Sequence, residues 1–179
     1  MKTIKSLTTG LLSYALLFAV NANGQENPKL SDAEVASVAV TANQIDIDYA
    51  EIAKEKSKNK EILRFAETMK NDHTAVINQA VALVTKLNVT PKDNAVSQQL
   101  LADAAKTKKT LQAKSSRTFD KAYIDNEVAY HKAVIGAVEG LLIPEAENAE
   151  LKELLTNVLP ALKTHLAHAE MVQKQISGK

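Results

Sequence analysis

Three histidines and two carboxylates stand at positions where helical periodicity requires an apolar side chain. They are His73, His131, His165, Asp46 and Glu127. A buried imidazole needs a hydrogen-bond partner or a metal ion on each nitrogen that loses contact with water. If the five side chains meet in one dry interior, their nitrogen and oxygen donors form a ligand set for a first-row transition metal. The chemistry that these residues predict is therefore metal binding.

Two interpretations of this set stay open. In the first, the site holds a divalent transition metal, with iron, manganese or zinc as the candidate ions. The chain has no cysteine, and this disfavours copper(I), which prefers sulfur ligands. In the second, the histidines and carboxylates neutralise one another as a metal-free polar network inside a structural or interaction module of the cell envelope.

Three further side chains are candidates for supporting or alternative ligands. Asp72 precedes His73 and is expected either to face solvent or to orient that ring. His168 follows His165 by about one helical turn and suits the surface as well as the site. Glu139 is expected to point away from the apolar face of its helix.

Apolar periodicity predicts the elements that carry these residues. Steps of three and four predict helices over about 31–56, 60–87, 93–114 and 118–142, and a last one from 148 onward. Ser31 and Glu34 form a capping box that marks the first helix start. Pro91 interrupts the chain before the third helix, and Pro160 predicts a kink or a split of the last helix near Asn157.

The composition favours an all-α fold. Hydrophobic residues make up 45% of the 179 residues, with only five glycines and four prolines, so helices are favoured almost everywhere. Four of the predicted helices are long and strongly patterned. The helix at 93–114 has a narrow apolar stripe, which suits a crossover lying across a bundle. The prediction is a four-helix bundle with an additional helical crossover between the second and third long helices.

Helix counting tests whether the ionisable residues can meet. Asp46 lies 13 residues before the turn at Asn59 and His73 lies 14 after it, so the two side chains are level on antiparallel neighbours. Glu127 and His165 lie 15 and 17 residues from the two ends of the next antiparallel connection. The sequence leaves open whether the two pairs share one level, because the crossover sets their relative height.

The first 24 residues have the pattern of a secretory signal peptide. Two lysines precede an uncharged apolar run that ends in small residues. Cleavage is predicted after Ala22 or Gly24, which leaves 25–179 as one domain in the periplasm or outside the cell. The apolar run is shorter than the roughly 20 residues that span a bilayer, so no transmembrane segment is predicted in the mature chain. An uncleaved membrane anchor is the alternative.

Charge and motifs exclude several classes of function. The formal charge is +1 and becomes −1 without Lys2 and Lys5, so no basic field would attract nucleic acid. Nucleophilic triads, phosphate-binding loops and CxxC motifs are absent from the sequence. Binding is therefore favoured over catalysis. A peroxide-handling oxidoreductase would need an open coordination position. No protein partner is indicated, and a homodimer is compatible with the sequence.

Several stretches resemble a known family. They are DAEVASVAV, AEIAKEKSKNKEILRFAETMKNDHT, FDKAYIDNEVAYHKAV and LPALKTHLAHAEM, spread over about 32–173. The most specific marks are Met69 with the Asp72-His73-Thr74 run, Phe119-Asp120 followed by Ala122-Tyr123 and His131, and Leu159-Pro160 leading to His165. The chain is similar to the DUF4142 family of exported bacterial ferritin-like proteins. The resemblance implies a ferritin-like four-helix bundle with a long crossover and an exported location, and no particular activity.

The chain departs from the ferritin-like di-iron pattern, which needs two Glu-x-x-His motifs. Lys70, Val128 and Leu162 stand three residues before the three candidate histidines. Oxygen activation or iron storage of the ferritin kind is therefore not supported. A mononuclear histidine-rich site, or a site that has lost its metal, fits the residues better. The predicted role is metal binding or stress protection in the envelope.

Overall fold

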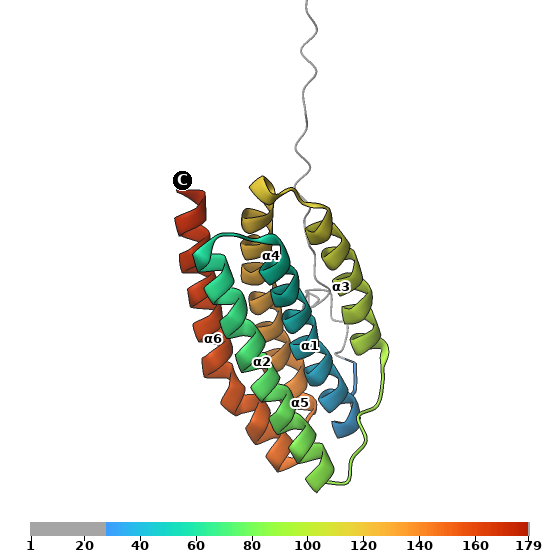
Figure 1. Cartoon of the computed structure of the whole chain (residues 1–179). Helices are drawn as coiled ribbons and strands as arrows, with labels where there is room; N and C mark the ends of the chain where they lie inside the picture. Colours follow the sequence, from blue (N-terminus) through green and yellow to red (C-terminus); the bar gives the residue numbers. More distant parts are fainter. Residues whose placement is uncertain (1–27, 179) are drawn as a thin grey trace, which may run out of the picture.

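The structure, a computed structural model, describes residues 28–178 and is helical over nearly all of that range (Figure 1). The predicted signal peptide at 1–24 lies outside the described residues. The elements are α1 (Asp32–Lys56), α2 (Lys60–Lys86), α3 (Ala95–Ala113), α4 (Ser116–Ala137), the π-helical turn η1 (Val138–Leu142), α5 (Ile143–Glu145) and α6 (Ala149–Ser177). The predicted all-α bundle with an additional helix between its second and third long helices is confirmed.

Two antiparallel helix pairs make up the bundle. The short connection at 57–59 folds α2 back along α1, and η1 with α5 leads α4 back into α6 (Figure 1). The α3 helix lies lengthwise beside α1 on the outside of the bundle. Its narrow apolar stripe predicted instead that it would lie across the bundle. Its buried residues are Ser97, Leu100, Ala104, Thr107 and Leu111. Their spacing of three and four keeps one continuous face of α3 in contact with its neighbours.

The last long helix is continuous through its proline. Pro160 lies inside α6, which runs unbroken from residue 149 to residue 177. The alternative of a split near Asn157 is therefore wrong. A proline removes one backbone donor, but packing of α6 along its whole length outweighs that loss. The helix buries Leu151, Leu155 and Leu162 before and after the proline.

The two halves of the bundle are filled differently. In the half near the α1–α2 connection, the rings of Phe65, Tyr123 and Phe119 are fully buried. Phe119 and Tyr123 stack with ring centroids 6.0 Å apart, and Phe65 meets Tyr123 edge-on at 6.2 Å. In the other half the helices face one another mainly through alanine, valine and leucine. Large rings therefore fix the first half, and small side chains leave space in the second.

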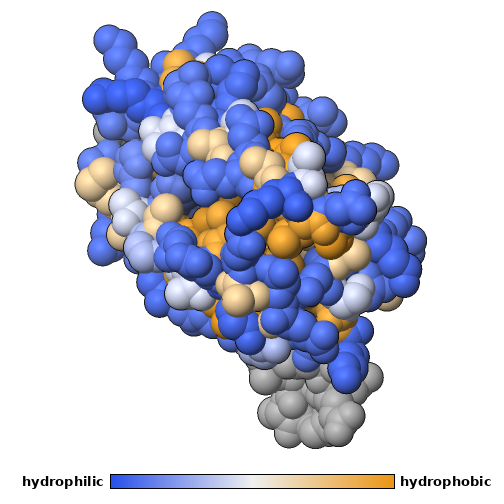
Figure 2. Space-filling model, turned by 90° about the horizontal axis from the view of Figure 1, so that it is seen from below, coloured by the Kyte–Doolittle hydropathy of each residue, from blue (hydrophilic) through white to orange (hydrophobic). Residues whose placement is uncertain are grey.

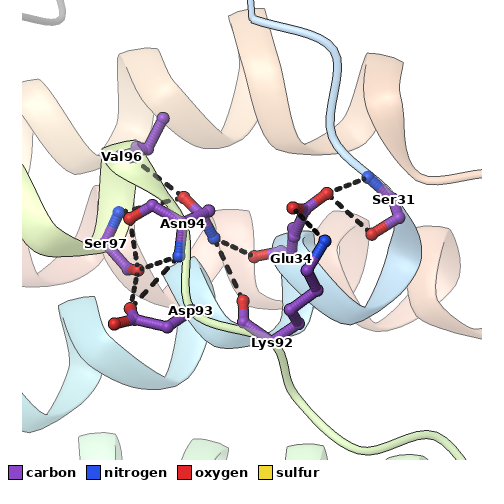
Figure 3. Close-up of polar contacts among 7 residues, drawn as sticks. All are labelled: Ser31, Glu34, Lys92, Asp93, Asn94, Val96 and Ser97. Atoms are coloured by element: carbon purple, nitrogen blue, oxygen red, sulfur yellow. Dashed lines mark hydrogen bonds and ion pairs between the residues drawn. The ribbon is translucent and has the colours of Figure 1, made fainter.

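Polar contacts tie the loop before α3 to the first turn of α1 (Figure 3). The carboxylate of Glu34 accepts hydrogen bonds from the backbone amide and the hydroxyl of Ser31, at 3.0 and 2.8 Å. The same carboxylate pairs with Lys92 at 3.1 Å. The side-chain amide of Asn94, which caps α3, donates to the backbone oxygen of Glu34 at 3.2 Å. The predicted capping box thus also anchors α3.

No helix in the described range is long and apolar enough to cross a membrane.

Replacing Glu34 by glutamine is expected to weaken the acid dependence of stability. The Ser31 amide and hydroxyl, followed by Lys92, lower the pKa of Glu34 from 4.5 to about 2. The group therefore stabilises the fold fully above pH 4.5, and this contribution disappears as the pH falls towards 2. Thermal melts followed by circular dichroism at pH 7 and pH 2.5 should show a smaller loss of Tm in Glu34→Gln than in wild type. Glu55→Gln, at an exposed position of the same helix, is the control and should behave as wild type.

Candidate metal centre

The four long helices bring the five predicted side chains into one buried layer. Asp46 comes from α1, His73 from α2, Glu127 and His131 from α4, and His165 from α6. One ligand atom from each of the three histidines lies within 4.8 Å of the other two, and the same holds for Asp46, Glu127 and His131. The two pairs that helix counting placed separately therefore share one level, with His131 common to both groups.

Asn43 fixes the protonation of the His73 ring. The side-chain amide of Asn43 donates to the backbone oxygen of Ala39 at 2.8 Å, so its oxygen faces the ring. That oxygen lies 2.7 Å from Nδ1 of His73 and can only accept a hydrogen bond. The proton of the neutral ring therefore sits on Nδ1. Nε2 of His73 keeps a lone pair that points into the layer.

The other two rings are held in the same manner. Nδ1 of His131 lies 3.0 Å from the backbone oxygen of Glu127, which again leaves Nε2 as the unprotonated nitrogen. Nε2 of His165 donates to the carboxylate of Asp72 at 2.8 Å, so this ring directs Nδ1 inward. A hydrogen bond on the outer nitrogen that orients the ring is the usual arrangement for a metal-binding histidine.

The inward-facing atoms have no hydrogen-bond partners among the described residues. These atoms are Nε2 of His73, Nε2 of His131, Nδ1 of His165, and both carboxylate oxygens of Asp46 and of Glu127. Leaving one buried polar group unsatisfied costs about 1–3 kcal/mol. A layer that leaves donor atoms of five side chains unpaired is expensive unless something binds between them. Since most of these atoms are lone-pair acceptors, a cation satisfies them together.

Distances to the Asp46 carboxylate fit shared coordination better than hydrogen bonding. Oδ2 of Asp46 lies 3.4 Å from Nε2 of His73 and 3.6 Å from Nε2 of His131. Good hydrogen bonds are shorter than this. Two ligand atoms bound to one tetrahedral ion at a typical distance of about 2.1 Å lie roughly 3.4 Å apart. The Nε2 atoms of His73 and His131 and Oδ2 of Asp46 thus have the spacing of ligands that share one ion, and His165 joins the two histidines in their ligand group.

Burial sets the charge of the metal-free layer. It lowers the pKa of His73, and the neighbouring His131 and His165 add to this effect while Asp46 opposes it. Burial also raises the pKa of Glu127 well above its usual range, the nearby Asp46 carboxylate raises it further, and the Asn126 side-chain amide acts in the opposite direction. The His73 ring is therefore neutral, which is its metal-binding form. The metal-free fold therefore favours the protonated form of Glu127 more strongly than the unfolded chain does.

The three supporting candidates have different positions. Asp72 is half-exposed and bonds His165 on α6, although the sequence suggested its neighbour His73. His168 packs edge-on against Phe65 with ring centroids 5.1 Å apart and belongs to neither ligand group. Glu139 pairs with Lys163 at 2.8 Å on the surface.

Sequence reasoning missed Asn43, which orients the His73 ring. It lies three residues before Asp46, so it follows the same face of α1 one turn earlier. The sequence signal that could have identified it was a side-chain amide one helical turn before a carboxylate predicted to be buried. Tyr130 is also fixed close to this layer, because its hydroxyl donates to the backbone oxygen of Ala42 at 2.8 Å.

Fold and site together define a helical bundle with a central histidine–carboxylate layer. The chain belongs to the DUF4142 family, described as a domain of unknown function, whose model matches residues 18–172. The solved structure of CopM in the Cu(II)-bound form shares the fold, with a TM-score of 0.59 and 15% identity over 83% of this chain and 99% of that one. No curated protein matches the sequence significantly.

Removing the ionisable group of Glu127 is expected to stabilise the metal-free protein at neutral pH. Because the pKa of Glu127 is raised in the fold, the folded state holds a proton that the unfolded state releases, and stability falls as pH rises above 4.5. Glu127→Gln removes this penalty. In chelator-treated protein its Tm should exceed that of wild type at pH 8, at about 2–4 °C for each kcal/mol gained. The difference should vanish near pH 4, and an equal gain at both pH values would contradict the assignment.

Proposed function

We propose that the protein is an exported helical bundle that binds one divalent transition-metal ion in its centre. His73, His131 and His165 supply three nitrogen ligands and Asp46 supplies an oxygen ligand. Asn43, Asp72 and the Glu127 backbone oxygen hold the rings in the orientation that binding needs. The observation that carries this proposal is the set of buried, inward-facing donor atoms without hydrogen-bond partners.

The donor set favours ions that prefer imidazole. Three nitrogens and a carboxylate suit zinc(II), copper(II) and iron(II), whereas manganese(II) prefers oxygen ligands. Copper(II) and zinc(II) also stand high in the general order of affinity of divalent metals. CopM, which shares the fold, is described in a Cu(II)-bound form. Copper(II) therefore joins zinc(II) and iron(II) as the ions to test.

The proposed set of four protein ligands around one ion favours a binding role. A catalytic metal typically keeps a position open for water or substrate, whereas four protein ligands complete a tetrahedral site. The signal-like pattern at 1–24 supports export. Retention of metal ions in the envelope, as protection against metal stress, is the activity that combines these features.

Replacing His73, one of the three histidines of the buried layer, should abolish metal binding. Replacing His168, which lies outside that layer, should not. The mature chain, purified without a histidine tag, is expected to bind about one equivalent of zinc or copper by elemental analysis after dialysis. His73→Ala should bind less than a tenth of this amount, because the remaining donors no longer surround the ion. His168→Ala is the matched control. Its ring lies outside both ligand groups, so its metal content should equal that of wild type.

The alternative of a metal-free polar network predicts the opposite results. Under that alternative, chelation leaves Tm unchanged and His73→Ala has the same metal content as wild type. Under the proposal, metal at a hundredfold excess over its Kd adds about 2.7 kcal/mol, which corresponds to a rise in Tm of roughly 5–10 °C. A melt with and without chelator separates the two.

Replacing Asp72 by asparagine should weaken metal binding without abolishing it. The carboxylate accepts the outer proton of His165 and so makes the inner nitrogen a better donor. Losing such a support typically lowers affinity about 10–100-fold. Competition with a chromophoric chelator measures the change. Asp103→Asn, on α3, serves as the control, and equal affinities of the two variants would show that Asp72 has no such role.

A further inference from the structure

A cavity of about 260 Å³ adjoins the histidine–carboxylate layer on the side opposite the aromatic half of the bundle. Its walls come from α1, α2, α4, η1 and α6, with Leu100 from α3. Eight polar residues line it, and every other lining residue is an alanine, a valine or a leucine. We propose that this cavity binds a small uncharged molecule with an apolar body and a single hydroxyl group, such as an alkylphenol or a medium-chain alcohol.

The size of the cavity sets the size of the ligand. An apolar cavity of about 150 Å³ stays dry and accommodates benzene, which has six heavy atoms. In proportion, 260 Å³ accommodates a molecule of about ten heavy atoms. The cavity therefore fits a single ring with a short alkyl chain, or an aliphatic chain of comparable volume.

The polar lining lies mainly at one end of the cavity. His73, His131, His165 and Asp46 form its inner wall, where their unpaired atoms are hydrogen-bond acceptors. A hydroxyl donates a hydrogen bond to such an atom. A carboxylate has no hydrogen to donate, so its oxygens would meet only the lone pairs of these acceptor atoms. The chemistry of the inner wall therefore selects a neutral hydroxyl as the head group.

The cavity is accessible from the surface. Ala75 and Gln79 on α2 and Ala161 on α6 line it and are also exposed to solvent, so the cavity lining reaches the surface at these two helices. Figure 2 shows apolar side chains gathered in the middle of the end of the bundle seen from below, framed by hydrophilic ones. A ligand can reach the inner wall without unfolding of a helix.

The binding test uses the metal-free mature chain and 4-propylphenol, which has ten heavy atoms. Isothermal titration calorimetry is expected to show one saturable site per chain. Ala80→Phe places a ring in the cavity from a buried position of α2 and should weaken binding at least tenfold. Ala82→Phe, at an exposed position of the same helix, should change it less than twofold.

Further outcomes decide the proposal. If Ala80→Phe does not fold, as judged by circular dichroism, Val76→Phe fills the same cavity from a half-buried position. Unchanged affinity in a folded cavity-filling variant, or the absence of saturable binding, overturns the proposal.

Propylbenzene, which lacks the hydroxyl, should bind at least threefold more weakly, and equal binding overturns the placement of the hydroxyl. Because no metal is present, these results are independent of the proposed metal binding.

Discussion

The constraint on which the structure depends is the burial of unpaired donor atoms in one layer. Each of the four long helices places at least one imidazole or carboxylate at the same height. An apolar interior makes such groups costly unless they are paired. The surrounding contacts do not pair them but orient them. Asn43, Asp72 and a backbone oxygen take the outer face of each ring and leave the inner face open.

The layer divides the bundle into two regions with different properties. On one side, Phe65, Phe119 and Tyr123 fill the space between helices and fix their separation. On the other, the helices contribute small or aliphatic side chains, and a cavity of about 260 Å³ remains. The π-helical turn η1, which contributes Val138 and Leu142 to the cavity wall, lies in this second region. A rigid half thus holds the rings in position while the other half gives access to them.

Sequence reasoning predicted much of this arrangement because helical geometry is regular. Counting residues from the turn at Asn59 placed Asp46 beside His73, which their 3.4 Å separation bears out. It could not relate these helices to α4 and α6, because the path of α3 depends on packing and not on periodicity. The partner of Asp72 was misjudged for a similar reason. Its carboxylate reaches across to His165 on another helix, and a single sequence contains no record of that contact.

Under the proposed metal binding, charge balance accounts for the second carboxylate of the layer. Imidazole binds a metal ion in its neutral form, so a divalent ion held by the three histidines with Asp46 alone would leave a net positive charge in a region of low dielectric constant. Among the described residues, Glu127 is the carboxylate that shares a ligand group with Asp46 and His131. Burial and Asp46 raise its pKa, so the metal-free fold favours its protonated form. If the proposed divalent cation were bound, release of the Glu127 proton would leave two negative charges against two positive ones. Glu127 is unfavourable as an anion in the metal-free bundle. The same residue would let this interior accept the proposed ion, because the ion and the two carboxylates together carry no net charge.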